Sequence, residues 1–262
     1  MENKYLSFAK EIAIQAGKIM KKYDSEDNGA SYKTDLTIVT KADKEINDYL
    51  VKRVQEEFPE HCVDGEEGGY GKSKYVWVCD PVDGTAMYAR HIPTSVFSLA
   101  LVVDGQPQIG VVYDVWKDSL YTAVKGDGAY RNGQKISVSD IDFGDKRGVG
   151  NYDMWPNAPY NIYEAVEELN KSIYLVSIGS VIRACMAVAG GDFSFAIFPG
   201  TTHKNCDIAA AKVIVEEAGG RVTDFNGEEQ RYDCDINGAI ISNKVVNKKL
   251  LETIKNYAKK RD

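Results

Sequence analysis

The middle of the chain is a series of short apolar runs rich in β-formers, and this series limits the possible folds more than any other feature of the sequence. Two of its connections, Asp104-Gly105 and Asn132-Gly133, are dipeptides typical of tight hairpin turns. Successive β-rich runs joined by such turns predict a meander of antiparallel strands. The predicted strands are residues 75–79, 95–104, 107–114 and 119–124.

Helical patterns lie on both sides of this meander. Apolar residues recur at three- and four-residue steps between Leu6 and Tyr23, and a second helix starts near Ala42 and is stopped by Pro59. After the meander, predicted helices and strands alternate, which is typical of a layered α/β arrangement. The helices are expected near 159–170, 181–189, 206–218 and 243–259, and the strands near 173–176, 193–198 and 239–242.

These patterns predict an α+β fold in one domain, residues 1–262, made of two closely packed lobes. We expect an antiparallel-meander N-terminal lobe at approximately 1–140 and an alternating α/β C-terminal lobe at approximately 141–262. A chain of this length buries a sizeable hydrophobic core. Neither an internal repeat nor a long linker interrupts the sequence.

Composition excludes several classes of protein. The formal net charge of −7 argues against a nucleic-acid-binding surface, which needs a basic stripe. The chain has no apolar run of about 18 residues, so we expect no transmembrane helix and no membrane partner. Its five cysteines include no CxxC pair, and its N-terminus has no continuous apolar signal core. We therefore expect a cytoplasmic protein with reduced cysteines.

The segment from Trp77 to Thr85 carries the strongest chemical signal. It places Asp80 and Asp83 three residues apart at the end of a β-rich run, with Pro81 between them. Aspartates at this spacing can converge on one point, and Mg²⁺ prefers carboxylate, water and phosphate oxygens as ligands. The alternative is an ordinary surface turn built on Asp-Pro and Asp-Gly, which is equally compatible with the residues of this segment alone.

Two further acidic segments add to this signal. Glu66 and Glu67 lie in a glycine-rich loop upstream, and Asp207 lies at the start of a predicted helix. An acid at a helix N-terminus also interacts favourably with the helix dipole, and for Asp207 taken alone that structural role is the more common one. A metal site therefore needs all three segments to meet.

Taken together, these segments resemble the inositol monophosphatase superfamily of lithium-sensitive, Mg²⁺-dependent phosphatases. The resemblance runs from about residue 5 to residue 255. It implies a layered αβαβα sandwich of the sugar-phosphatase type, a homodimer, and two or three Mg²⁺ ions per site. The matching segments are Val39–Asp43 (V-T-x-x-D), Gly65–Glu67 (G-E-E), Trp77–Thr85 (W-x-x-D-P-x-D-G-T), Gly126–Gly133 (G-x-G-A-x-x-N-G), Cys206–Ala210 (W-D-x-A-A, with cysteine in place of tryptophan) and Glu217–Gly220 (E-A-G-G).

The resemblance implies a role for each acid. Glu66 and Asp80, with the backbone carbonyl of Val82, resemble the ligands of a first magnesium ion. Asp80, Asp83 and Asp207 resemble the ligands of a second, so that Asp80 bridges the two ions. A two-metal site of this kind activates an attacking water and stabilises the leaving oxygen.

The same resemblance implies the catalytic and substrate-binding residues. Glu66 and Thr85 are expected to orient the attacking water, with Asp43 behind Thr85 as a hydrogen-bond acceptor. Both have a structural alternative, because Thr85 is also a possible capping hydroxyl and Asp43 an acid in the first turn of a helix. The residues expected to contact the substrate are Asp83, Gly84, Thr85, Gly179, Ser180, Val181, Arg183 and Asp207.

Three departures from the family pattern concern the choice of substrate. Cys206 replaces a tryptophan and Met87 replaces the usual asparagine. Gly200 stands where enzymes specific for inositol phosphates carry a glutamate that holds ring hydroxyls. Loss of that acceptor weakens recognition of a polyol. We therefore expect inositol monophosphate not to be the main substrate.

Basic residues in the same neighbourhood suggest a different substrate class. Arg183, His203 and Lys204 are placed to bind a second anionic group, although Arg183 and Lys204 could equally be solvated surface charges. The sequence therefore predicts Mg²⁺-dependent hydrolysis of a phosphate monoester of a small soluble metabolite. The alternatives are a phosphatase specific for a bisphosphate, such as fructose 1,6-bisphosphate or 3′-phosphoadenosine 5′-phosphate, and a non-catalytic metal- or ligand-binding member of the same fold.

Overall fold

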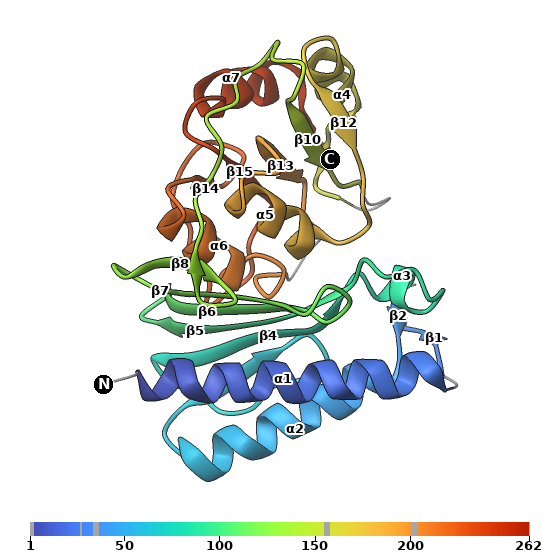
Figure 1. Ribbon diagram of the computed structural model, residues 1–262, viewed down its shortest axis with the longest axis vertical. Coiled ribbons are helices and arrows are strands. Elements are labelled where there is room, and N and C mark those ends of the chain that lie inside the picture. The colour runs from blue at the N-terminus through green and yellow to red at the C-terminus, as the bar shows by residue number, and fades with distance from the viewer. Residues whose placement is uncertain (1–2, 27, 34–36, 155–157, 201–203, 262) are drawn as a thin grey trace.

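The computed structural model describes residues 3–26, 28–33, 37–154, 158–200 and 204–261. Helices and sheets stack in five layers, in the order helices, sheet, helices, sheet, helices (Figure 1). The layered αβαβα sandwich predicted from the sequence is therefore confirmed.

Two long helices, α1 (Lys4–Ser25) and α2 (Lys41–Glu57), form the first layer. Both are amphipathic, and their apolar faces cover one side of the larger sheet (Figure 1). Ile12, Met20 and Ile46 on these faces are completely buried. The predicted helical pattern at the N-terminus is confirmed.

The second layer is a seven-stranded sheet in the order β3-β4-β5-β6-β7-β8-β9. From β4 onward each strand pairs antiparallel with the next, so the predicted meander is confirmed. β3 is an addition: it pairs parallel with β4, and its sequence Cys-Val-Asp-Gly has no β-rich pattern. The bounds are β3 (Cys62–Gly65), β4 (Tyr75–Asp83), β5 (Val96–Val103), β6 (Gln106–Asp114), β7 (Ser119–Val124), β8 (Gly128–Arg131) and β9 (Gln134–Lys135).

The third layer consists of α5 (Val181–Ala189) and α6 (Ala209–Glu217), which lie between the two sheets (Figure 1). Most side chains of these two helices are buried in one core cluster with residues of both sheets. Both sequences are largely apolar, as expected for helices covered on two faces. The site described below is built around their N-terminal ends.

The fourth layer is a mixed five-stranded sheet in the order β12-β10-β13-β15-β14. β10, β12 and β13 are parallel, whereas β15 runs antiparallel to both β13 and β14. The sequence pattern misses β10 and β14, because neither contains a β-rich run of sufficient length. The bounds are β10 (Val149–Tyr152), β12 (Tyr174–Val176), β13 (Phe195–Phe198), β14 (Arg221–Thr223) and β15 (Ala239–Ser242).

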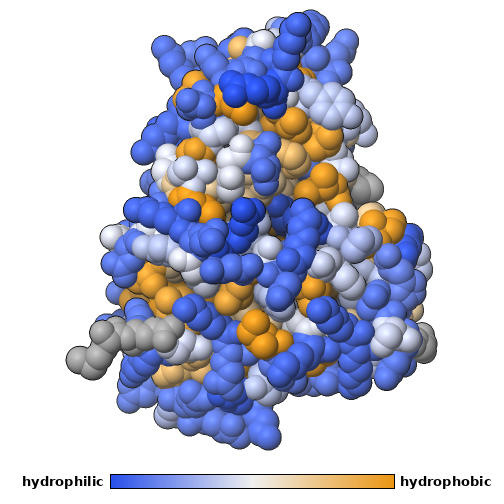
Figure 2. Space-filling model, in the orientation of Figure 1, coloured by the Kyte–Doolittle hydropathy of each residue, from blue (hydrophilic) through white to orange (hydrophobic). Residues whose placement is uncertain are grey.

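Helices α4 (Tyr163–Asn170) and α7 (Asn247–Tyr257) form the last layer. Figure 2 shows a face that is mostly hydrophilic, with apolar residues in small separate groups. Among the described helices, none combines the length and the apolar character needed to cross a membrane. The remaining short elements are α3 (Thr85–Tyr88), β1 (Ser31–Tyr32), β2 (Ile38–Val39), β11 (Tyr160–Asn161) and β16 (Lys259–Lys260).

Candidate active site

A β-bulge in β4 brings Asp80 and Asp83 to the same face of the large sheet. Asp80 pairs with Ser98 and Asp83 with Val96, so three steps along β4 oppose two steps along β5. In a regular strand, side chains alternate between the two faces, so residues three apart point to opposite faces. The extra residue of the bulge shifts this alternation, so Asp80 and Asp83 point to the same face. Pro81 lies at the bulge, where a strand tolerates the loss of a ladder N–H. The Asp-Pro-x-Asp spacing is therefore what converges the two carboxylates.

Asp207 joins this pair from the segment that precedes α6. One carboxylate oxygen from each of Asp80, Asp83 and Asp207 lies within 4.8 Å of the others, and all three residues are buried. The N-cap of α6 is Ile208, so Asp207 faces the other aspartates instead of capping the helix. Its Oδ1 accepts a hydrogen bond from the thiol of Cys206 at 3.8 Å. The cysteine that replaces a tryptophan thus leaves this carboxylate in place.

Burial raises the pKa of every aspartate in this cluster. The pKa of Asp83 and that of Asp207 rise to about 7. The pKa of Asp80 rises well above its usual value, first through burial and then through the negative charge of Glu66. Buried carboxylates this close repel one another unless a cation lies between them. The donor set fits a hard divalent cation, which Asp80, Asp83 and Asp207 would hold.

The first turn of α5 holds Asp83 in position. Asp83 Oδ2 accepts hydrogen bonds from the hydroxyl of Ser180 and from the backbone N–H of Ile182, the latter at 2.9 Å. Free N–H groups and the helix dipole favour an anion at this end of a helix. The Ser180 hydroxyl also accepts from the N–H of Arg183 at 3.2 Å. Gly179 and Ser180 lie against Gly84, and Val181 is buried. The contacts of these three residues with a substrate stay predictions.

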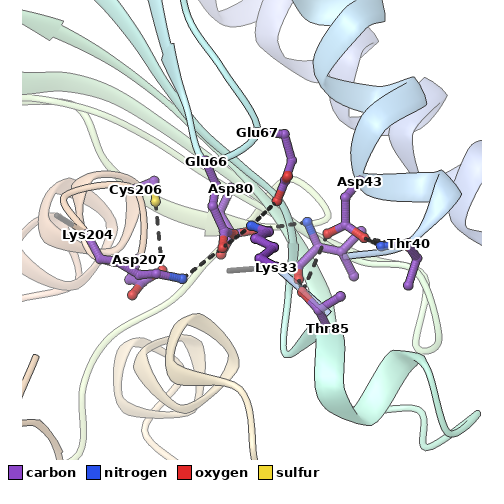
Figure 3. A network of polar contacts seen from close by, with 11 residues as sticks. Lys33, Thr40, Asp43, Glu66, Glu67, Asp80, Thr85, Lys204, Cys206 and Asp207 are labelled. Atoms are coloured by element: carbon purple, nitrogen blue, oxygen red, sulfur yellow. Dashed lines mark hydrogen bonds and ion pairs between the residues drawn. The ribbon is translucent and has the colours of Figure 1, made fainter. Parts of the chain in front are cut away.

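Glu66 lies beside the aspartates and pairs with the ammonium groups of two lysines (Figure 3). Its Oε1 accepts hydrogen bonds from Lys204 Nζ at 2.8 Å and from Lys33 Nζ at 3.2 Å. Burial opposes the ionisation of Glu66, but the charges of Lys204 and Lys33 outweigh it and lower its pKa. Lys204 in turn has a raised pKa, because Asp207 and Glu66 outweigh its burial. Lys204 is therefore part of the acidic cluster and not a solvated surface charge.

Thr85, Asp43 and Thr40 form a second polar unit (Figure 3). The Thr85 hydroxyl donates to Val82 O at 2.8 Å and lies 3.4 Å from Asp43 Oδ1. Asp43 also completes the capping box of α2, accepting from Thr40 N–H at 2.8 Å. Burial raises the pKa of Asp43 to about 7. Asp43 therefore caps α2 and also lies close to the Thr85 hydroxyl.

Arg183 contacts protein groups in this structure. Its guanidinium lies 3.2 Å from Asp114 Oδ2 at the end of β6 and donates a hydrogen bond to Pro93 O. The two charged side chains are only 15% and 5% exposed. The predicted contact of Arg183 with substrate stays a prediction, and His203 lies outside the described residues.

Three polar residues of the region are missed by sequence reasoning. Lys33 stands in a polar loop with no motif. Asp153 follows β10 and is buried, and this burial, followed by the charge of Asp207, raises its pKa to about 6. Asn205 donates to Asp64 Oδ2 at 2.8 Å and to Tyr232 O at 2.9 Å. Their roles become visible only when the distant segments are packed together.

A five-layer αβαβα sandwich with a buried acidic cluster between its sheets defines a phosphatase, that is, a phosphoric monoester hydrolase. The model of the inositol monophosphatase family matches residues 1–259. The chain belongs to this family, as its motifs predicted.

Curated relatives and solved structures agree with this assignment. A Thermotoga maritima protein named fructose-1,6-bisphosphatase/inositol-1-monophosphatase is 32% identical over 192 residues, 73% of each chain. Human inositol monophosphatase 2 is 31% identical over 237 residues, 84% of this chain and 80% of the human protein. The solved structure of a T. maritima IMPase aligns with a TM-score of 0.86 at 28% identity, covering 97% of this chain and 98% of the other.

Proposed function

We propose that this protein is a Mg²⁺-dependent phosphatase that hydrolyses the phosphate monoester of a small soluble metabolite. The observation that supports it most is the convergence of Asp80, Asp83 and Asp207, three buried carboxylates that need a cation. We propose that Glu66 and the Val82 carbonyl complete the ligands of two or three ions. Magnesium, once bound, activates the attacking water and stabilises the leaving oxygen.

The remaining steps belong to the residues of the chain. Glu66 and Thr85 orient the attacking water; the Thr85 hydroxyl takes the water's proton and passes its own proton to Asp43, whose carboxylate lies 3.4 Å away and keeps it. The backbone N–H groups of Gly84 and Thr85, at the start of α3, donate to the phosphate oxygens. Ser180 and Ile182 keep Asp83 aimed at the ions during the reaction. Fixed donors and ligands of this kind act without reorganisation in the transition state.

We propose that the substrate is not a polyol phosphate of the kind that a glutamate at position 200 would bind. Gly200 has a φ of +82°, and a Cβ there would lie 2.6 Å from Gly238 N. A glutamate side chain therefore does not fit this backbone, which supports a substrate other than inositol monophosphate. The half-buried ammonium groups of Lys33 and Lys204, together with the double name of the T. maritima relative, favour a bisphosphate as the second candidate.

Phosphate release from a panel of esters tests both proposals. The panel contains inositol 1-phosphate, fructose 1,6-bisphosphate, histidinol phosphate and 3′-phosphoadenosine 5′-phosphate, each with Mg²⁺ and with EDTA. We expect at least one ester to be hydrolysed with Mg²⁺ and none with EDTA, with inositol 1-phosphate turned over more slowly than the preferred ester. Asp83→Asn should reduce turnover at least a hundredfold, an order typical of losing a catalytic electrostatic group. Unchanged turnover by this variant would refute the metal assignment.

Assembly and location are proposed on more general grounds. We propose a homodimer formed by the single domain 1–262, with lobes at approximately 1–140 and 141–262. We also propose that the enzyme works in the cytoplasm, where its cysteines stay reduced: Cys62, Cys79, Cys185 and Cys206 are buried free thiols.

A further inference from the structure

Lys204 contacts the carboxylate of Glu66, which the proposed function assigns to a metal ion. Its ammonium lies 2.8 Å from Glu66 Oε1, and the two side chains are 23% and 12% exposed. Lys33 approaches the same oxygen at 3.2 Å. A carboxylate oxygen has two lone pairs, so two ammonium donors use the whole capacity of this atom. An ion that binds to Glu66 Oε1 must displace at least one of them.

The two lysines differ in what they do when displaced. Lys33 also pairs with Glu67, so it keeps a carboxylate partner after leaving Glu66. The ion pair that the described residues show for Lys204 is the one with Glu66. Lys204 also lies three residues before Asp207, so the backbone keeps it close to the cluster. Displacing Lys204 therefore breaks a short ion pair and leaves the ammonium close to the arriving ions.

We propose that Lys204 is a built-in counterion that competes with magnesium for Glu66 and so sets the Mg²⁺ concentration at which the site fills. The proposal rests on the metal site of the proposed function and adds a regulator of its affinity. In the metal-free protein, Lys204 neutralises Glu66 and keeps the carboxylates from repelling one another. Magnesium bound to Glu66 Oε1 would replace the ammonium there, and the free energy of that ion pair would be subtracted from the binding of the metal.

Calorimetric titration of the purified protein with Mg²⁺ alone tests this competition. We expect Lys204→Met to bind Mg²⁺ about tenfold more tightly than the wild type, which corresponds to about 1.4 kcal/mol. The control Lys125→Met makes the same change at an exposed lysine and should leave the affinity unchanged. In EDTA, Lys204→Met should melt at a lower temperature than the wild type, because Glu66 has lost a partner.

A double-mutant cycle separates competition from simple charge repulsion. In the Glu66→Gln background the carboxylate that Lys204 and the ion share is gone, so Lys204→Met should change the affinity about twofold or less. Equal factors in both backgrounds, or a Lys204→Met affinity that is unchanged or weaker, would overturn the proposal. If Lys204→Met does not fold, Lys204→Gln removes the charge with a polar side chain and carries the same expectations.

The two proposals fail in different ways. If the wild-type protein bound no Mg²⁺ at millimolar concentration and had the same turnover as Asp83→Asn, the metal site and the proposed function would both be refuted. A wild-type protein that binds Mg²⁺ with an affinity insensitive to Lys204 would leave the phosphatase intact and refute only the counterion.

Discussion

His61 is held as a hydrogen-bond acceptor. Its Nδ1 accepts from Trp77 Nε1 at 3.1 Å, and its ring stacks on Phe58 and on Tyr75. An imidazolium carries a proton on both nitrogens, so protonation of His61 breaks its bond to Trp77. Trp77 lies on β4, three residues before Asp80.

This arrangement predicts a loss of stability in mild acid. Burial, followed by the charge of Lys4, lowers the pKa of His61. The folded protein then binds this proton less readily than the unfolded chain does, so stability is complete above the ordinary histidine pKa of ~6.5 and falls as the pH drops below it. Urea unfolding at pH 7.5 and pH 5 should show a larger loss for the wild type than for His61→Gln.

The exposed His91 supplies the control for this measurement. His91→Gln should follow the wild type at both pH values, because the exposed contact of His91 with Asp24, at 3.0 Å, contributes little to stability. Parallel losses in the wild type and in His61→Gln would show that His61 does not couple protonation to folding.

The hydroxyl of Thr85 is expected to matter for turnover more than for folding. It donates to Val82 O at 2.8 Å and faces Asp43, so it connects a proposed ligand to a buried acceptor. Thr85→Ser keeps the hydroxyl and should stay within about tenfold of the wild-type kcat, whereas Thr85→Val should lose about 10²–10⁴, the range of a positioned proton-transfer group. Steady-state kinetics at saturating Mg²⁺ check this. Similar values for both variants would limit Thr85 to a structural role.

At the scale of the elements, the turn between β4 and α3 leaves no room for a side chain on Gly84. Gly84 has a φ of +82°, and a Cβ there would lie 2.8 Å from Gly179 O in the segment before α5. Gly179 in turn lies against Met87, since its own Cβ would meet Met87 Cγ at 2.8 Å. Met87, which departs from the family pattern, therefore packs where the two segments touch.

Comparison with a second glycine isolates this close approach. Gly126 also has a positive φ, of +90°, but a Cβ there meets nothing within 4 Å. Alanine at either position costs about 1–2 kcal/mol of backbone strain, and Gly84→Ala adds about 1–3 kcal/mol of overpacking. Urea unfolding should therefore place Gly84→Ala below Gly126→Ala in stability, and its kcat should also fall. Equal stability losses would mean that the Gly84–Gly179 contact relaxes freely.

Taken as one molecule, the protein builds its acidic cluster from two layers, the large sheet and the middle helix layer. Asp80 and Asp83 come from the large sheet, and Asp207 comes from the segment leading into α6. An ion held by all three links these parts and binds only the folded chain. Metal binding is therefore coupled to global stability.

Magnesium should raise the melting temperature measurably. At a concentration a hundredfold above its Kd, a ligand adds about 2.7 kcal/mol, which is about 5–10 °C for a chain of this size. Thermal melts with Mg²⁺ and with EDTA measure the shift, with NaCl at equal ionic strength as the control. Asp207→Asn should lose most of the shift, and a full shift in this variant would exclude Asp207 as a ligand.

Much of this architecture follows from patterns that are local in the chain. The meander, the two N-terminal helices and α5 are readable because apolar periodicity and turn dipeptides depend on neighbours only a few residues away. The segment Trp77–Thr85 likewise contains its own bulge, since the proline and the spacing of its acids lie within nine residues. The sequence by itself therefore determined the layers, the family and the candidate acids of the site.

Tertiary structure decided what those acids touch. The hydroxyl of Ser180 reaches Asp83 across 97 residues, and Lys204 reaches Glu66 across 138. β3, β10 and β14 also form only by pairing with strands that are distant in the sequence or follow a helix, and Asp153 joins the site only through β10. Such contacts form when whole layers pack together. No local sequence pattern indicates them. The pairing of Lys204 with Glu66 is therefore visible only in the folded molecule.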